Sequence, residues 1–519
     1  MTAKIDISPE QLAIVQRILK DHLPLGTLAW AFGSRVTWTA KPFSDLDIAL
    51  EGAAPLAPDV LIDLEEAFDS SNLPWKVDVI DLNAVSPEFR TIVERQRVPA
   101  DWKDVTLSDV SDPSRKITYG IVQPGQLHSE GVPIVRVNNF RGNSLDLTDR
   151  LAVSPEIEEK YRRSRPRPGD LLISLVGSIG QLSIAPPEIE GWNLARAVGL
   201  VPFANQAVAN WSFYSLQSTA SQDFMNQRAN TTVQTTFNLK DLAKIPIQLP
   251  PEWEMDGILT TLQALDDKIE LNRRMNETLE AMARSVFRDW FVDFGPTRRK
   301  AAGFTDPAAI LGGLLPDPTQ AAPLAAIFPA RFGANSLPEG WEKRTLGDVV
   351  EPRKGRNITK KTVVPGDVPV VAGGLNPAYY HNTPNVSGPV ITASASGANA
   401  GFVRLYHQDI WASDCSFISL EQTDYIFAIY ALLSSRQDEI YSMQQGAAQP
   451  HIYPSDLKRL PIADAPKQVW KSLEKLLAPM FELIANNEHE NQTLAATRDL
   501  LLPKFMSGEL RMTVAEGVT

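Results

Sequence analysis

The sequence predicts a multidomain chain of mixed α/β and α+β character, with two long helices that pair as an intramolecular antiparallel coiled coil. Two observations predict this: one segment of the chain recurs at a constant spacing, and each copy of it ends in a long heptad helix. The 519 residues suffice for three or four domains of roughly 100–200 residues each. The 43% apolar and 22% charged residues exclude a disordered or collagen-like chain.

The repeat is clearest where each copy closes. Residues 234–247, QTTFNLKDLAKIPI, align with residues 449–462, QPHIYPSDLKRLPI, at a spacing of 215. Further upstream Trp102 aligns with Trp341 at a spacing of 239. The unit from 99 to 296 therefore recurs from 337 to about 510, and the second copy is 24 residues shorter. Glycine-punctuated apolar runs in both copies indicate β-rich globular halves.

Each copy ends in about five heptads whose seam positions are mostly apolar. The first seam is Ile258, Leu262, Leu265, Ile269, Asn272, Asn276, Leu279, Ala283, Val286 and Trp290, and the second is Leu473, Leu477, Met480, Ile484, Asn487, Asn491, Leu494, Arg498, Leu501 and Phe505. The alternative is two amphipathic helices, each packed on its own domain, although their 3.6-residue stripes would drift off a strict heptad.

Two asparagines stand at the middle of each seam. In an antiparallel pair the centres of the helices coincide, so Asn272 and Asn276 would lie beside Asn487 and Asn491 and satisfy their amides. We therefore expect a coiled coil that holds two similar globular units at opposite ends. Residues 297–336, rich in Ala, Pro and Gly, are interpreted as a linker that carries the chain back along a helix of about 50 Å.

Three stretches carry a family resemblance: LPEGWEKRTLGDV at 337–349, QQGAAQPHIYPSDLKRLPI at 444–462, and DDKIELNRRMNETLEAMARSVFRDWFVDFGP at 266–296. They resemble the DNA-specificity subunit of type I restriction–modification systems. The resemblance implies a cytoplasmic protein of phage defence with two target-recognition domains, each reading half of a split site in double-stranded DNA. It also implies a scaffold for two methyltransferase subunits and for restriction/translocase subunits.

The expected domains follow from the repeat and the resemblance. They are an N-terminal domain at 1–98, target-recognition domain 1 at 99–256, coiled-coil helix 1 at 257–296, the linker at 297–336, target-recognition domain 2 at 337–468, coiled-coil helix 2 at 469–510 and a tail at 511–519. Because the two recognition domains differ in sequence, the site should be asymmetric. A rod of about 50 Å spans roughly 14 base pairs.

Each recognition unit contains a basic cluster that we interpret as a DNA contact, although a solvated charged loop is the alternative. The first cluster is Lys160, Arg162, Arg163, Arg165 and Arg167, and the second is Arg353, Lys354, Arg356, Lys360 and Lys361. Weaker candidates are the turns 230–232 and 446–448, which precede Gln234 and Gln449.

Other chemistries lack their signatures. Asn376-Pro377-Ala378-Tyr379 is similar to an adenine-methyltransferase motif, but no glycine-rich cofactor segment precedes it, so we interpret it as structural. The sequence has no P-loop, and its single cysteine, Cys415, excludes an internal disulfide. Methylation and ATP hydrolysis are therefore expected from partners. The net charge of −12 neither indicates nor excludes DNA binding, because local basic patches determine whether a protein contacts phosphates.

The first 98 residues have a separate signature. Gly33-Ser34 follows an apolar strand, and Asp45 and Asp47 begin the next one, where alternate residues share a face. A third strand, WKVDVI at 75–80, contributes Asp78. Three carboxylates on neighbouring strands can hold two Mg²⁺ ions that bridge a triphosphate and activate an attacking oxygen.

This segment resembles a minimal nucleotidyltransferase of the DNA polymerase β-like superfamily. The resemblance implies Mg²⁺ and a nucleoside triphosphate as cofactors, Asp45, Asp47 and Asp78 as metal ligands and catalytic residues, and nucleotide binding by Gly33, Ser34 and Arg35. Family members often have Gly where Trp38 stands, so either an active enzyme with an altered loop or a degenerate binding domain is compatible with the sequence. Similar stand-alone domains act as antitoxins that nucleotidylate a partner toxin.

The leading interpretation is a specificity subunit with an added nucleotidyltransferase-like module. One alternative is a nucleotidyltransferase, modifying a protein or a nucleic acid in the manner of a toxin–antitoxin pair, that the repeats deliver to DNA. Another is an interaction scaffold with no DNA readout. Because a domain with its own core should couple only weakly to its neighbours, we expect the N-terminal module to act independently of DNA recognition.

Overall fold

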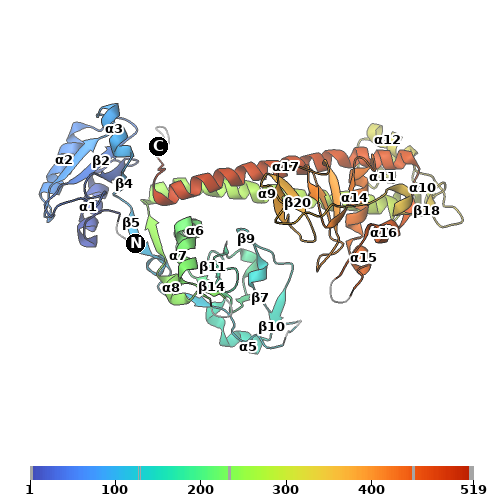
Figure 1. The fold of residues 1–519 in the computed structure, drawn as a ribbon, viewed down its shortest axis with the longest axis horizontal. Coiled ribbons are helices and arrows are strands. Elements are labelled where there is room, and N and C mark those ends of the chain that lie inside the picture. The colour runs from blue at the N-terminus through green and yellow to red at the C-terminus, as the bar shows by residue number, and fades with distance from the viewer. Residues whose placement is uncertain (1–3, 127, 129, 232–234, 447–449, 513–519) are drawn as a thin grey trace. The chain divides into compact units, whose positions relative to one another are not determined.

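The computed structural model describes residues 4–126, 128, 130–231, 235–446 and 450–512, and Figure 1 shows the order of their elements. Two compact units divide the chain: Met1–Asp267 with Leu494–Thr519, and Lys268–Thr493. We call them the first and second units and describe each by itself. Within the described residues no helix has the length and apolarity needed to span a membrane.

The N-terminal part of the first unit is a four-stranded mixed sheet with three helices. The elements are α1 Pro9–His22, β1 Leu28–Phe32, β2 Leu46–Glu51, α2 Pro58–Asp69, β3 Val77–Asp81, α3 Pro87–Glu94 and β4 Val98–Pro99, and the sheet order is β3-β2-β1-β4. Strand β2 pairs antiparallel with β1 and parallel with β3. Helix α1 begins at a Ser8 capping box followed by Pro9, a strong N-terminal signal.

The rest of the first unit is a recognition fold whose described residues form one four-stranded sheet, one three-stranded sheet and three two-stranded pairs. Its strands are β5 Lys103–Thr106, β6 Thr118–Tyr119, β7 Val132–Val135, β8 Phe140–Arg141, β9 Ser144–Leu145, β10 Leu151–Val153, β11 Leu171–Ser174, β12 Leu182–Ile184, β13 Asn193–Leu194, β14 Val198–Val201, β15 Asn230–Thr231, β16 Thr235–Thr236 and β17 Pro246–Leu249. Its helices are α4 Leu107–Val110, η1 Val137–Asn139, α5 Pro155–Lys160, η2 Arg162–Ser164, η3 Pro187–Ile189, α6 Gln206–Gln217, α7 Thr219–Arg228 and α8 Leu239–Ala243.

The second unit repeats this fold. Its elements are β18 Glu342–Thr345, α13 Leu346–Val349, β19 Arg353–Lys354, β20 Val368–Val371, β21 Tyr379–His381, β22 Val390–Ser394, β23 Val403–Tyr406, β24 Trp411–Ala412, β25 Cys415–Ser419, α14 Ile426–Ser435, α15 Gln437–Ser442, α16 Pro454–Lys458 and β26 Pro461–Asp464. Its sheet orders, β19-β25-β22-β23 and β21-β20-β24, match β6-β14-β11-β12 and β10-β7-β13 of the first unit. The internal repeat therefore produces two copies of one topology.

Most of the length difference between the copies lies in one region. The first residues of β7 and β20 are 236 positions apart, whereas those of β11 and β22 are 219 apart. The extra residues of the first copy form the β8–β9 hairpin and the segment with α5 and η2. The basic cluster at 160–167 therefore lies in a segment that the second copy lacks.

The long helices α9 Glu252–Phe291 and α17 Lys467–Ser507 form the expected antiparallel pair. In the second unit Asn272 donates to Asn491 Oδ1 at 3.0 Å, and Asn487 donates to Asn276 Oδ1 at 2.8 Å. The four seam asparagines therefore pair across the helices, as expected from their central positions. In the first unit the seam residue Arg498 forms an ion pair with Asp266 at 2.7 Å.

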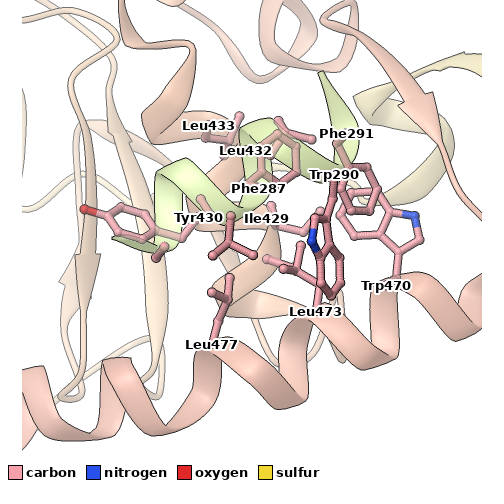
Figure 2. Packing of buried hydrophobic residues seen from close by; sticks show 14 of the residues in the cluster. Phe287, Trp290, Phe291, Ile429, Tyr430, Leu432, Leu433, Trp470, Leu473 and Leu477 are labelled. Carbon is pink, nitrogen blue, oxygen red and sulfur yellow. The ribbon is translucent and has the colours of Figure 1, made fainter. Parts of the chain in front are cut away.

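The recognition fold of the second unit is packed onto both helices. Figure 2 shows side chains from α9, α14 and α17 meeting in one cluster, including Trp290, Ile429 and Leu473. The backbone amides at the start of α14 donate to the Glu474 carboxylate of α17. Helix and recognition fold thus share one core.

The segment predicted as a linker contains short helices. Residues 297–336 include most of α10 Gly295–Ala301 and the helices α11 Pro307–Ile310 and α12 Pro318–Ala326. Ile310, Leu311 and Ala321 are buried in the same core as the end of α9. The segment folds back on that helix end because its alanines and leucines form an apolar surface, a pattern masked by its prolines and glycines.

Candidate nucleotide site and DNA-contact surfaces

Two of the three candidate carboxylates lie side by side on parallel strands. Asp47 in β2 is the register partner of Asp78 in β3, and Asp45 immediately precedes β2. Burial raises the pKa of Asp47, and the charges of Asp78 and Asp45 raise it further. The fold therefore gathers like charges at one sheet end, and a cation there would relieve their repulsion.

A lysine partly neutralises this cluster. Lys76 Nζ lies 2.5 Å from Asp78 Oδ1, and the aspartate raises the pKa of the lysine. Sequence reasoning missed Lys76, although its position two residues before Asp78 on the same strand was a usable signal.

The Gly33 position can hold only glycine without a backbone shift. Its φ is +79°, and an added Cβ would lie 2.2 Å from Asp47 Oδ2. Gly33 therefore allows the loop after β1 to approach the carboxylate closely. Ser34 follows at the partly exposed start of this loop.

Arg35 differs from its expected role in nucleotide contact. It is only 5% exposed, and its guanidinium donates to the carbonyls of Asp6 and Ser44 and lies over the Trp75 ring. Arg35 thus holds the two ends of the 33–45 loop together. Its buried guanidinium donates to backbone oxygens, so it stabilises the loop that contains Gly33 and Ser34.

Trp38 lies in the loop after Gly33, and its backbone adopts a conformation that glycine favours. Its φ is +58°, in the left-handed region, and its side chain is 51% exposed. The loop therefore keeps a glycine-like path in spite of the large side chain, and the indole projects to solvent.

The donor set fits Mg²⁺ in chemical kind, because carboxylate oxygens are its preferred protein ligands. Nevertheless, no three His, Cys, Asp or Glu side chains among the described residues converge closely enough to hold a metal ion. Lys76 holds Asp78, and Asp45 is exposed, so ion binding requires these two side chains to turn toward Asp47.

The cations of the first basic cluster differ in how strongly they are ion-paired within the fold. Arg165 makes ion pairs with Glu158 at 2.6 Å and Glu159 at 2.7 Å, so its guanidinium is occupied within the fold. Arg162 has a looser partner in Glu159 at 3.6 Å and a side chain that is 71% exposed. Lys160, Arg163 and Arg167 are also exposed.

The second cluster is more open. Arg353 is 3.1 Å from Glu421, with both side chains largely exposed. Lys354, Arg356, Lys360 and Lys361 are exposed as well. Arg353 and Lys354 form β19, which lies at one end of its sheet.

The two clusters arise from non-equivalent sequence segments yet reach equivalent places in the fold. In the first unit η2, with Arg162 and Arg163, packs beside the edge strand β6. In the second unit the basic residues are on β19, the topological counterpart of β6, and in the loop after it. Both recognition folds thus present cations at the same edge of the same sheet.

The remaining sequence candidates are the motif at 376–379 and the turns beside the paired glutamines. Asn376-Pro377-Ala378-Tyr379 leads into β21, and the Ala378 amide donates to the Val370 carbonyl, so the motif forms part of a strand pairing. Gln234, Gln449 and half of the residues in the turns 230–232 and 446–448 lie outside the described residues.

Sequence reasoning also missed an exposed apolar stripe on α9. Leu271, Met275 and Met282 are each at least 37% exposed, and spacings of four and seven place them on one helix face. They lie off the heptad seam, so this second spacing was the signal in the sequence.

A protein-family model described as the type I restriction modification DNA specificity domain matches residues 99–281 and 338–494. The chain belongs to this family. A second model, polymerase beta nucleotidyltransferase, matches residues 15–98. The two family matches thus cover the recognition repeats and the N-terminal sheet separately.

Curated relatives agree with this division of the chain. The EcoBI specificity subunit of Escherichia coli is 30% identical over 44% of this chain and 50% of its own length, so the chain spans half of that relative. The HindI specificity subunit of Haemophilus influenzae is 22% identical over 79% of this chain and 100% of its length. A probable protein adenylyltransferase, MntA, of Haemophilus influenzae is 44% identical over 20% of this chain and 91% of its length. The N-terminal segment is therefore a nucleotidyltransferase domain joined to a specificity-family chain.

Proposed function

We propose that this protein is the DNA-reading subunit of a type I restriction–modification complex, and that each recognition fold reads one half of a bipartite, asymmetric site. The observation that carries the proposal is the equivalent placement of cations at β6 with η2 and at β19. Two folds of one topology meet DNA by one edge, while their different loops read different bases.

The exposed cations are the proposed phosphate and base contacts. In the first fold these are Arg162, Arg163 and Arg167, with Arg165 holding the segment through Glu158. In the second fold they are Lys354, Arg356, Lys360 and Lys361, with Arg353 at the start of the strand. The antiparallel helix pair sets the spacing between the half-sites, because a packed seam fixes the length of the rod.

The helix pair also provides the proposed docking surface for two methyltransferase subunits, to which restriction/translocase subunits are added. The stripe of Leu271, Met275 and Met282 offers an apolar helix face that a partner helix can cover. Leu271→Glu with Met275→Glu should reduce the methyltransferase content of the purified complex, measured by native mass spectrometry. Gln492→Glu, on an exposed position of α17, is the control, and a complex of unchanged composition in the stripe variant would contradict this docking site.

The experiment that tests DNA reading is co-expression with a type I methyltransferase subunit, followed by mapping of N6-methyladenine. We expect two short motifs separated by a fixed gap, and a swap of residues 99–256 should change one motif only. Deleting one heptad from both helices should change the gap. A continuous or palindromic motif would contradict the proposal.

Charge-reversal variants separate contact from folding. Arg162→Glu with Arg163→Glu should weaken DNA binding and flatten its salt dependence by about one unit of slope per lost phosphate contact. Lys360→Glu with Lys361→Glu should do the same for the second half-site. Lys240→Glu, on the exposed surface of α8 away from the β6 edge, is the matched control.

For the N-terminal domain we propose Mg²⁺-dependent nucleotidyl transfer. Asp45 and Asp47 would hold the ion, Asp78 would complete the site and accept the proton of the attacking hydroxyl, and Gly33 and Ser34 would receive the triphosphate. Bound Mg²⁺ would supply charge neutralisation at the phosphates. With an ion bound, Lys76 would be released from its ion pair with Asp78 and would be available to the phosphate oxygens.

The strong identity with a probable protein adenylyltransferase favours one second candidate function, in which this transfer is the main activity and the repeats deliver it to DNA. Asp45→Asn with Asp47→Asn should abolish transfer of labelled nucleotide to any acceptor. If methylation of the bipartite motif never occurs in cells while transfer does, the second candidate replaces the first. Failure of the wild type to bind any Mg²⁺-nucleotide would instead indicate a degenerate domain.

A further inference from the structure

One fully buried arginine joins the nucleotidyltransferase domain to the recognition fold of the first unit. The Arg511 side chain is 0% exposed and lies 2.6 Å from Glu254 Oε2 and 2.8 Å from Asp101 Oδ2. It also donates to the Ala29 carbonyl at 3.0 Å. These partners belong to the first turn of α9, the segment after β4, and strand β1, so Arg511 ties the C-terminal segment to three distant parts of the chain.

Two indoles enclose this arginine. Its guanidinium carbon lies 5.0 Å from the ring centre of Trp30 and 5.7 Å from that of Trp102. Trp102 Nε1 donates to Glu254 Oε2 at 3.0 Å. We call Arg511, Glu254, Asp101, Trp30 and Trp102 the arginine node.

Each side of the node leads to a proposed functional site. On one side, Ala29 and Trp30 are in β1, which runs directly into Gly33 and the nucleotide loop. On the other side, Trp102 packs edge-on against Trp211 of α6 with ring centres 5.8 Å apart, in the core of the recognition fold. A contiguous path of packed and hydrogen-bonded groups therefore runs from the nucleotide loop to the recognition core.

The arginine node keeps its geometry only if all of its charged members are present. Removing one member of a buried ionic group leaves an uncompensated charge, which costs far more than replacing the group with apolar residues. A displacement of β1 at Ala29 therefore cannot be absorbed by loosening Arg511 alone; it must move Glu254 and the start of α9 as well.

We propose that the arginine node couples nucleotide occupancy to DNA affinity: Mg²⁺-nucleotide bound at Gly33 and Ser34 tightens DNA binding by the first recognition fold. This inference rests on the function proposed for both sites. Nucleotide binding orders β1 and the node, so less conformational entropy remains to be lost when DNA binds. By linkage, DNA must tighten nucleotide binding by the same factor.

The test measures both affinities with the full chain in its methyltransferase complex. The ligands are a DNA duplex carrying the mapped motif and a non-hydrolysable ATP analogue with Mg²⁺. In the wild type we expect saturating analogue to lower the DNA Kd by about tenfold, within the usual range for coupled sites. In Arg511→Met with Glu254→Met, which removes the Arg511–Glu254 ion pair, keeps its volume and leaves Asp101 as the remaining charge of the node, each ligand should still bind and the ratio should fall to about one.

Lys504→Met, on the last turn of α17 with a side chain that is 44% exposed, is the control and should keep the wild-type ratio. A second measurement guards against misfolding: on adding analogue, the first-turn amides of α9 should become more protected from hydrogen exchange in the wild type but not in the double variant. A wild-type ratio of one, or an unchanged ratio in the double variant, overturns the coupling. Absence of nucleotide binding to the wild type overturns both the coupling and the proposed transferase, whereas the bipartite methylation motif stands or falls independently.

Discussion

At the scale of single residues, the proposed nucleotide site depends on how closely the loop after β1 approaches Asp47. Gly33 is the clearest case, because its conformation and its distance from Asp47 both exclude a side chain. The aspartates repel one another: burial raises the pKa of Asp47, and the charges of Asp78 and Asp45 raise it further. Lys76 pairs with Asp78, and Arg35 donates to the Ser44 carbonyl at the end of the loop, so both side chains position neighbours of the site.

Gly33→Ala should abolish nucleotide binding and destabilise the N-terminal sheet, because the new Cβ must displace either the loop or Asp47. The expected loss is about 1–3 kcal/mol, the range for a strained backbone position. Isothermal calorimetry with Mg²⁺-nucleotide and thermal unfolding measure the two effects. Gly142→Ala is a matched control, since Gly142 also has a positive φ but an added Cβ would meet nothing within 4 Å. Unchanged nucleotide affinity in Gly33→Ala would contradict the proposed site.

His407 should make the second unit acid-sensitive. Burial lowers its pKa to about 4, and its ring lies beside Phe427 and Phe481. Because the folded pKa is below the unfolded value of about 6.5, the stabilisation is complete above pH 6.5 and is lost as the pH falls toward 4. The loss should reach about 2 kcal/mol after allowance for partial solvent exposure.

Hydrogen exchange of β23 and α14 amides between pH 4 and 7 measures this loss, after correction for the intrinsic exchange rate. Burial raises the pKa of Glu474 and of Glu488, and these carboxyl groups oppose the histidine effect in the same window. The informative quantity is therefore the difference between wild type and His407→Gln, with His22→Gln as control. If His407→Gln leaves the pH dependence of α14 opening unchanged, the histidine is not the sensor.

At the scale of elements, the helix pair illustrates how polar residues set register. The pairs are Asn272 with Asn491 and Asn276 with Asn487, so a helix slip would separate four amides from their partners at once. The recognition folds show a different principle. Their common edge strand carries charge in the second copy, whereas an inserted 3₁₀ turn supplies it in the first.

Asn487→Leu alone should destabilise the helix pair by about 1–3 kcal/mol, because it leaves the half-buried Asn276 Oδ1 without the donor that Asn487 supplies. Asn276→Leu with Asn487→Leu replaces the complete pair and should be neutral or stabilising. Urea denaturation followed by helix circular dichroism measures both. A double variant less stable than the single one would show that the lost hydrogen bond between the two amides does not explain the cost of Asn487→Leu.

At the scale of the whole molecule, a transferase domain has become part of a specificity-family chain. The N-terminal domain matches its family over residues 15–98 and contributes the Ala29 carbonyl and Trp30 ring to the arginine node. The node also contains a residue from the C-terminal segment, so both ends of the chain meet in it.

A chain beginning at residue 99 should therefore fold less stably than a sum of independent domains implies. It loses Trp30 and the Ala29 carbonyl from around the buried Arg511 and exposes an ionic cluster that was fully enclosed. Thermal unfolding of the truncated chain should show a lower Tm. Adding Arg511→Met with Glu254→Met should recover part of the loss, whereas a truncated chain as stable as the full one would argue against an integral domain.

The sequence by itself determined the duplication, the helix pair with its central asparagines, and the positions of Asp47 and Asp78 on strands. These features are readable because they depend on local periodicity, and because strand alternation and heptads are properties of neighbouring residues. Only the tertiary structure decided that Arg35 faces backbone carbonyls, that Arg165 is occupied by Glu158, and that residues 297–336 fold onto the end of α9. It alone brought Arg511 to Ala29, a contact across 482 residues of chain. Such contacts leave no periodic signal, because they depend on which surfaces meet after the elements have formed.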